Sequence, residues 1–182
     1  MLKKQISILG ISGSLKSTSS NTNIIRFISA IAPVHVSIKL FEGLDALPHF
    51  NPETMEIIKE VENLRQQIKD ADAVIFSTPE YAFGVPGVLK NALDWLVSSG
   101  ELNEKTVAAI SASPLYSGGD KALASLMLTL TALGTNMAAN ASLSIANIKN
   151  KINEAGIVTE VESVSALQLL LENLISRVKD EE

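Results

Sequence analysis

The chain has 182 residues, of which 46% are hydrophobic, and a formal net charge of −5; this is enough apolar sequence for one sizeable core, so we expect a single domain over residues 1–182. Cysteine is absent, which excludes disulfides, thiolate catalysis and cysteine-ligated metal centres, and the two histidines lie in no ligand-like spacing, so we expect no bound metal. No basic cluster favours a nucleic-acid or membrane surface and no apolar run is long enough to cross a bilayer, so we expect a cytoplasmic protein whose partners are small molecules and other subunits.

Short apolar runs that are typical of buried strands alternate with helical patterns along the first half of the chain. The first strand is expected at Ile6–Ile11, followed by a Ser/Thr-rich loop and a helix from about Asn21 to Ile31. A second strand is expected at Val34–Leu40 and a long loop at Leu44–Thr54. The next helix is the clearest, because its apolar residues from Ile57 to Ala71 keep a 4-3-4-3 spacing.

The second half of the chain continues the alternation. A third strand is expected at Ala73–Ser77, and Pro86 opens a helix in its first turn that runs to about Val97. A fourth strand is expected at Val107–Ala112, followed by a helix at Leu123–Leu133 that Gly134 ends. A fifth strand is expected within Asn136–Ile145 and a last helix at Val161–Val178.

This βαβαβαβαβα order predicts an α/β fold: a flavodoxin-like three-layer sandwich with a five-stranded parallel sheet in the order 2-1-3-4-5 and helices on both faces. In such sheets ligands bind at the carboxyl ends of the strands, near the switch point between strands one and three. The loops after strands one, three and four are therefore the candidate binding loops.

The loop after the first strand has the composition of an anion cradle. Gly13 permits close backbone approach, Lys16 supplies one positive charge, and five residues offer short neutral donors: Ser14, Ser17, Thr18, Ser19 and Asn21. The segment lacks both the GxxxxGK[ST] and the GxGxxG order, which favours a phosphate monoester over a triphosphate or a dinucleotide. A polar turn with a helix cap is the alternative that this loop alone leaves open.

The loop after the third strand reads Pro79-Glu80-Tyr81-Ala82-Phe83-Gly84-Val85-Pro86-Gly87-Val88-Leu89-Lys90-Asn91-Ala92-Leu93-Asp94-Trp95. Together with the first loop it resembles the NADPH-dependent FMN reductase family, whose two loops read close to GSLRxxSxN and PEYNxSxPGxLKNAxDW. The resemblance extends from Ile6 to about Leu133.

The resemblance implies where a flavin would bind. Residues of the first motif would hold the FMN phosphate, namely Ser14, Leu15, Lys16, Ser17, Thr18, Ser19, Ser20 and Asn21. Residues of the second would line the isoalloxazine ring, namely Pro79, Glu80, Tyr81, Ala82 and Phe83, with backbone N–H groups of residues 82–84 near the ring. Ser113 would touch the flavin, and Gly118 and Gly119 would keep the backbone close to it.

Two residues depart from the family pattern. Lys16 stands where the family often has arginine, so a bidentate fork toward phosphate becomes a point charge. Ala82 stands where the family usually has asparagine, so one amide contact to the flavin is missing. The remaining loop residues favour structural roles: Trp95 in the core or a subunit interface, and Asn91 and Asp94 as braces of the loop.

The resemblance implies an NAD(P)H-dependent reductase with FMN as cofactor and NADPH or NADH as hydride donor. It would reduce a small acceptor, such as free flavin, a quinone, an azo dye or a metal oxyanion, by ping-pong hydride transfer, with no catalytic side chain of the protein. A homodimer or higher homo-oligomer is implied as well. An FMN-binding electron carrier without nicotinamide turnover and a flavin-free phosphate-ligand sensor are the competing hypotheses.

Overall fold

The protein is described by a computed structural model, in which residues 5–180 are placed. Its elements, in chain order, are β1 Ile6–Ser12, α1 Ser20–Ile31, β2 Val36–Leu40, the 3-10 turn η1 Leu44–Ala46, α2 Lys59–Asp70, β3 Ala73–Thr78, α3 Gly87–Asp94, β4 Thr106–Ala112, α4 Asp120–Ala132, β5 Asn136–Ile145, the 3-10 turn η2 Ile148–Asn150 and α5 Val161–Asp180. The strands form one parallel sheet in the order β2-β1-β3-β4-β5, which confirms the predicted flavodoxin-like topology.

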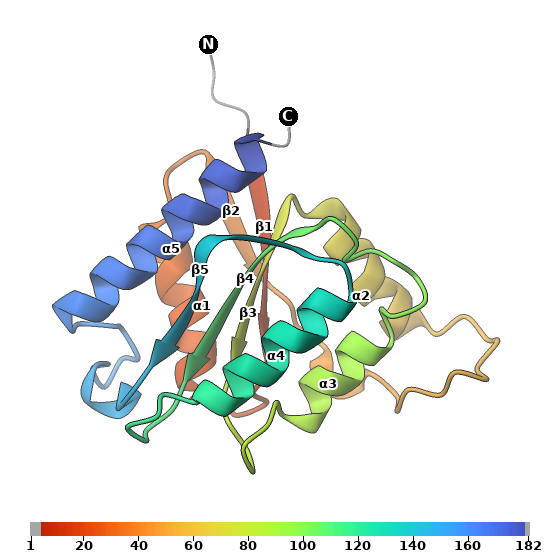
Figure 1. The fold of residues 1–182 in the computed structure, drawn as a ribbon, viewed down its shortest axis with the longest axis horizontal. Helices are drawn as coiled ribbons and strands as arrows, with labels where there is room; N and C mark the ends of the chain where they lie inside the picture. The colour runs from red at the N-terminus through yellow and green to blue at the C-terminus, as the bar shows by residue number, and fades with distance from the viewer. Residues whose placement is uncertain (1–4, 181–182) are drawn as a thin grey trace.

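The sheet separates two apolar clusters because successive strand residues point to opposite faces. On one face Ile8 and Ile75 pack with apolar residues of α1 and α5, and on the other Leu9 and Phe76 pack with α2, α3 and α4. Figure 1 shows the same three layers, with α1 and α5 on one side of the strands, at the left, and α2, α3 and α4 on the other side, at the right. Both sheet faces are covered, which explains why the central strands are continuously apolar. Among residues 5–180 no helix is long and apolar enough to cross a membrane.

Two predicted boundaries were wrong. The strand expected from Val34 begins at Val36, because the N–H of Val36 donates to the carbonyl of Pro33 at 2.8 Å and closes a turn. The helix expected from Ile57 begins at Lys59, where Ile58 is an extended N-cap. Ile57 is 88% exposed, and the neighbouring Ile58 packs against the core instead. The helical spacing was thus correct from Val61 onward, but the predicted helix began too early, at Ile57 instead of Lys59.

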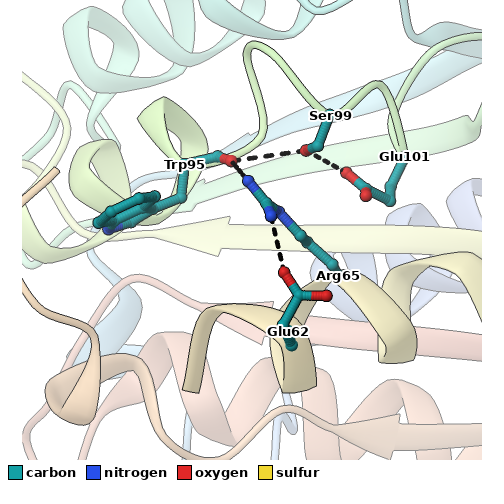
Figure 2. A network of polar contacts seen from close by, with 5 residues as sticks. All are labelled: Glu62, Arg65, Trp95, Ser99 and Glu101. Carbon is teal, nitrogen blue, oxygen red and sulfur yellow. Dashed lines mark hydrogen bonds and ion pairs between the residues drawn. The ribbon is translucent and has the colours of Figure 1, made fainter. Parts of the chain in front are cut away.

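The helix expected at Pro86 to Val97 is shorter than predicted. Pro86 is its N-cap instead of a first-turn residue, and α3 ends at Asp94. Figure 2 shows how the end is held: the carbonyl of Trp95 accepts a hydrogen bond from Arg65 of α2 at 3.0 Å and one from the hydroxyl of Ser99 at 3.5 Å, while Arg65 also pairs with Glu62 at 2.7 Å. The carbonyl of Trp95 follows the last helical residue and takes its partners from Arg65 and Ser99, so this network joins α2 to the end of α3.

The start of α5 is capped by a carboxylate. The backbone N–H of Ser163 donates to Oε2 of Glu160 at 2.7 Å, and Nζ of Lys151 lies 3.6 Å from the same oxygen. The hydroxyl of Ser163, its backbone N–H and the charge of Lys151 together lower the pKa of Glu160 below its ordinary value. Because the charged form of Glu160 is favoured in the folded state, it contributes stability above its unfolded pKa of about 4.3 and loses that contribution as pH falls through the lower folded value.

We therefore expect Glu160→Gln to lower the thermal midpoint at pH 7 and to weaken its dependence on pH below about 5, because the substituted side chain no longer titrates. Thermal unfolding measured between pH 7 and pH 3 tests this. The control is Glu172→Gln in the middle of α5, which removes a carboxylate away from the helix start and should give a curve parallel to that of the unmodified protein. Parallel curves for Glu160→Gln and the unmodified protein would contradict the assignment.

Candidate functional site

A cavity of about 580 Å³ lies at the carboxyl edge of the sheet, a size typical of small-molecule sites. Its walls come from the loops after β1, β3 and β4 and from η2, which follows β5. The lining residues are Ser14, Lys16, Thr18, Ser19, Ser20, Asn21, Pro79, Glu80, Tyr81, Ala112, Ser113, Pro114, Leu115, Ile148, Lys149 and Ile152. The three loops singled out from the sequence therefore meet in one place.

The N-terminus of α1 opens into this cavity. Ser19 is its N-cap: the hydroxyl accepts a hydrogen bond from the N–H of Thr22 at 3.4 Å, and the carbonyl accepts one from the N–H of Asn23 at 2.9 Å. Within residues 5–180 the N–H groups of Ser20 and Asn21 have no acceptor. The first turn of α1 also contains no acidic residue. Free N–H groups at the positive end of a helix dipole are suited to bind an anion.

The side chain of Asn21 is used in hydrogen bonds that hold the fold together. Its Nδ2 donates to the carbonyl of Ala112 at 3.1 Å, and its Oδ1 accepts a hydrogen bond from the hydroxyl of Ser77 at 2.9 Å. Asn21 is only 3% exposed. The sequence assigned this residue to phosphate binding; in the structure its carboxamide holds α1 against β3 and β4, and its backbone N–H is the group that stays available.

The first loop is shaped by its own hydroxyl groups. The hydroxyls of Ser12 and Thr22 share a hydrogen bond of 2.8 Å, and the backbone N–H groups of Ser14 and Lys16 donate to the hydroxyls two residues before them at 3.4 Å. Gly13 is needed for a reason that the sequence did not indicate: a Cβ there would lie 2.9 Å from Cδ2 of Leu89 in α3. The glycine thus permits packing of the loop against α3.

The second loop is tied to α4 by Glu80. Its Oε2 accepts hydrogen bonds from the backbone N–H groups of Lys121 and Ala122 at 2.9 and 3.0 Å. The carboxylate therefore satisfies the first turn of α4 and fixes the loop beside the cavity.

A tight hairpin follows Glu80. Tyr81 and Gly84 exchange backbone hydrogen bonds of 3.1 and 3.0 Å, and the two residues between them have positive φ, 49° at Ala82 and 60° at Phe83, as in a type I′ turn. The N–H of Gly84 is consumed in this turn, so the expectation that it faces a flavin ring was wrong. Tyr81 lines the cavity, whereas Ala82 and Phe83 form the exposed tip.

The third loop is held by the segment after β5. Ser113 is 5% exposed; its N–H donates to the carbonyl of Ile145 at 3.2 Å, and its carbonyl accepts a hydrogen bond from the N–H of Ile148 at 3.1 Å. Gly118 has φ +65°, and a Cβ there would lie 2.9 Å from the backbone nitrogen of Ala146. The close approach at Gly118 is thus made to the end of β5.

The structure brings most of the predicted site residues together. Those outside the cavity lining are Leu15, Ser17, Ala82, Phe83 and Gly118, and those that sequence reasoning missed are Ala112, Pro114, Leu115, Ile148, Lys149 and Ile152. The three residues after β5 could have been found by the same rule that selected the other loops, because the carboxyl end of β5 lies at the same edge of the sheet.

The expectation that Trp95 is a core residue was correct, whereas Asn91 and Asp94 were expected to brace the second loop: Asp94 instead pairs with Lys90, and Asn91 braces the loop around Pro48. Trp95 is 6% exposed, donates its indole N–H to the carbonyl of Pro48 at 2.9 Å and packs edge-on against Phe50. Asn91 braces the same loop, donating to the carbonyl of Pro48 at 2.9 Å and accepting from the N–H of Phe50 at 2.8 Å.

Ala82 stands at a turn position with φ 49°, a conformation that asparagine adopts more readily than alanine. We expect Ala82→Asn to stabilise the fold by about 0.5–1 kcal/mol, because the strain of a left-handed alanine is relieved. Urea denaturation measures this change. The control is Ala30→Asn on the exposed part of α1, where asparagine should destabilise by up to about 0.7 kcal/mol. Destabilisation by both substitutions would contradict the turn assignment.

Comparison with known proteins places this geometry in a family. Residues 6–150 match the profile of a family described as NADPH-dependent FMN reductase. The chain is 31% identical over 177 residues to an NAD(P)H-dependent FMN reductase of Pseudomonas aeruginosa, a match that covers 95% of each chain. It is 33% identical over 98 residues to a quinone reductase of Escherichia coli, where the match spans 52% of each chain.

The fold also matches a solved structure. The flavoenzyme NAD(P)H:(acceptor) oxidoreductase FerB from Paracoccus denitrificans superimposes with a TM-score of 0.87 at 26% identity, covering 96% of this chain and 98% of FerB. The cavity at the sheet edge is thus built on a fold that this flavoenzyme shares.

Proposed function

The chain belongs to the NADPH-dependent FMN reductase family of oxidoreductases, and from this premise we propose that its sheet-edge cavity holds FMN and that the protein passes electrons from NADPH or NADH to a small acceptor. The observation that carries the proposal is the cavity of about 580 Å³ that joins the free N-terminus of α1 to the Pro79–Tyr81 loop and the Ser113–Leu115 loop. The proposal includes a cytoplasmic location, because the cell keeps its reduced nicotinamide dinucleotides there.

The residues present fit a flavin mononucleotide. The mouth of α1 offers two free N–H groups, and Ser14, Thr18, Ser19 and Ser20 line the cavity around it. This set of neutral donors suits a phosphate monoester. Leu115 and Ile148 give the cavity apolar surface, as a flat aromatic ring requires.

Each wall would have its own role. Ser14, Lys16, Thr18, Ser19 and Ser20 would hold the phosphate, with the backbone of Leu15 and Ser17 in support. On the other side, Pro79, Glu80, Tyr81 and Ser113 would border the ring, and Glu80 would act by fixing the loop to α4. Ala82 and Phe83 would approach the ring only through their backbone at the hairpin tip.

Bound FMN would supply the hydride and electron transfer, so the protein needs no nucleophile of its own. The chain positions the group and controls access to it. Tyr81 is 58% exposed and Leu115 60% exposed at the cavity wall, which leaves the opening accessible from solvent. Donor and acceptor would use this opening in turn, so we propose ping-pong kinetics, with parallel initial-rate plots. For the acceptor we propose a quinone, free flavin, an azo dye or a metal oxyanion; relatives named as FMN reductase and quinone reductase support this range.

The phosphate contact can be tested at Ser19. We expect Ser19→Gly to weaken FMN binding by about 1.5–3 kcal/mol, the loss of one hydrogen bond to a charged group, while the helix cap loses only a few tenths of a kcal/mol. Fluorescence titration with FMN and with riboflavin measures this. Riboflavin lacks the phosphate, so its affinity should not change. Asn21→Ala is a poorer probe, because it would leave the carbonyl of Ala112 and the hydroxyl of Ser77 without their partner.

Two outcomes would reject the proposal. A protein that binds no FMN would favour a flavin-free phosphate-ligand sensor. A protein that binds FMN but whose flavin absorbance does not bleach promptly when NADPH or NADH is added without oxygen would favour an electron carrier. Intersecting initial-rate plots would contradict the ping-pong order alone.

We propose in addition that the protein forms a homodimer through the face that carries α3 and α4. Two large apolar side chains are exposed there: Val97, just after α3, is 65% exposed and Leu128, in α4, is 75% exposed. Both helices cover the same face of the sheet (Figure 1). Exposed apolar groups that recur on one face are typical of association surfaces.

Sedimentation equilibrium tests the dimer. We expect the mass of two chains for the unmodified protein and a shift toward one chain for the double variant Val97→Glu, Leu128→Glu, because buried charge would oppose association. Val34→Glu is the matched control, since Val34 is 98% exposed in a turn beside β2. A monomeric unmodified protein would contradict the proposal.

A further inference from the structure

The cavity carries positive charge in an otherwise acidic chain. Its lining includes two lysines, Lys16 from the first loop and Lys149 from η2, and one carboxylate, Glu80. The carboxylate of Glu80 is already engaged at the N-terminus of α4, because its Oε2 accepts the backbone N–H groups of Lys121 and Ala122. Among residues 5–180, neither Lys16 nor Lys149 forms an ion pair with a carboxylate. Two lysines without counter-charges therefore face a site in a chain whose net charge is −5.

The backbone places Lys149 beside the mouth of α1. The carbonyl of Ala112 binds the side chain of Asn21 at 3.1 Å, in the first turn of α1. The carbonyl of the next residue, Ser113, binds the N–H of Ile148 at 3.1 Å, and Ile148 directly precedes Lys149. The first turn of α1 and the turn that carries Lys149 are thus attached to consecutive residues at the end of β4.

The segment that follows η2 reaches α1 a second time. Asn153 and Ile157 close a hairpin through a hydrogen bond of 2.9 Å, and a Cβ at Gly156 within it would overlap the carboxamide of Asn23 in α1. Lys151 is drawn away from the cavity, because its Nζ lies 3.6 Å from Glu160. Three lysines lie in these segments: Lys16 in the first loop, Lys149 in η2 and Lys151 after it. Lys16 and Lys149 are the two whose charge remains available at the cavity.

We propose that Lys149 supplies the second positive charge at the mouth of α1 and acts as a positioning residue that selects phosphorylated flavin over riboflavin. This inference rests on the proposed function. A phosphate monoester carries a charge of about −1.5 to −2 at neutral pH. The first loop offers one point charge, Lys16, where the family often has an arginine fork. A second cation, from the opposite wall, brings the total positive charge at the site close in magnitude to the negative charge of the phosphate.

The test is Lys149→Gln, with the dissociation constants of FMN and riboflavin measured by fluorescence titration at low and high salt. We expect FMN binding to weaken about tenfold at low salt, by less at high salt because screening already reduces the contact, and riboflavin binding to stay unchanged. Lys149→Arg keeps the positive charge and should bind FMN as tightly as the unmodified protein does. Lys69→Gln removes the same charge from α2, away from the cavity, and should change neither affinity.

Three results would overturn the inference. Unchanged FMN affinity in Lys149→Gln would remove Lys149 from the phosphate site, and equal weakening for FMN and riboflavin would mean that it acts through packing. A KM that rises for NADPH but not NADH, with FMN affinity unchanged, would assign Lys149 to the dinucleotide. Failure of the unmodified protein to bind FMN would instead reject the proposed function itself, so the two failures are distinguishable.

Discussion

The buried carboxamide of Asn21 joins three elements at the carboxyl edge of the sheet, and the geometry of the cavity depends on it. It connects α1 to β3 through the hydroxyl of Ser77 and to β4 through the carbonyl of Ala112. Both partners are buried, so losing the carboxamide would leave polar groups unsatisfied away from water. With the side chain used in this way, the start of α1 is held in place while its backbone N–H groups stay directed outward.

The two helix N-termini near the cavity differ in which groups accept hydrogen bonds from their first backbone N–H groups. At α4 the carboxylate of Glu80 occupies the first N–H groups, so this end already has its negative charge. At α1 the cap is the neutral hydroxyl of Ser19, and the N–H groups of Ser20 and Asn21 remain without an acceptor among the described residues. Only the α1 end therefore has unused capacity for an anion, and it is the one on the cavity wall. Two lysines, Lys16 and Lys149, line the same cavity.

The departures from the family's loop motifs have identifiable structural consequences. Ala82 lies at the first central position of a type I′ turn, where the asparagine usual in the family would be the easier residue. The turn forms nevertheless, because Tyr81 and Gly84 bind each other through two backbone hydrogen bonds. Lys16 is exposed on the first loop and carries the same single charge as an arginine without its bidentate fork, and Lys149 adds a second charge on another wall of the cavity.

The sequence by itself determined the strand runs, the strand order and three of the loops that line the cavity, because apolar periodicity and loop composition record which face of each element is buried and the α/β order places those loops at one edge of the sheet. Only the tertiary structure decided which partners the loop residues take. The side chain of Asn21 is used by β3 and β4, Gly118 approaches β5, and Lys149 reaches a site first recognised from residues more than a hundred positions earlier. The physical reason is that a residue's own neighbours in the chain set its local conformation, whereas hydrogen-bond partners at the sheet edge come from segments that only the order of the strands brings together.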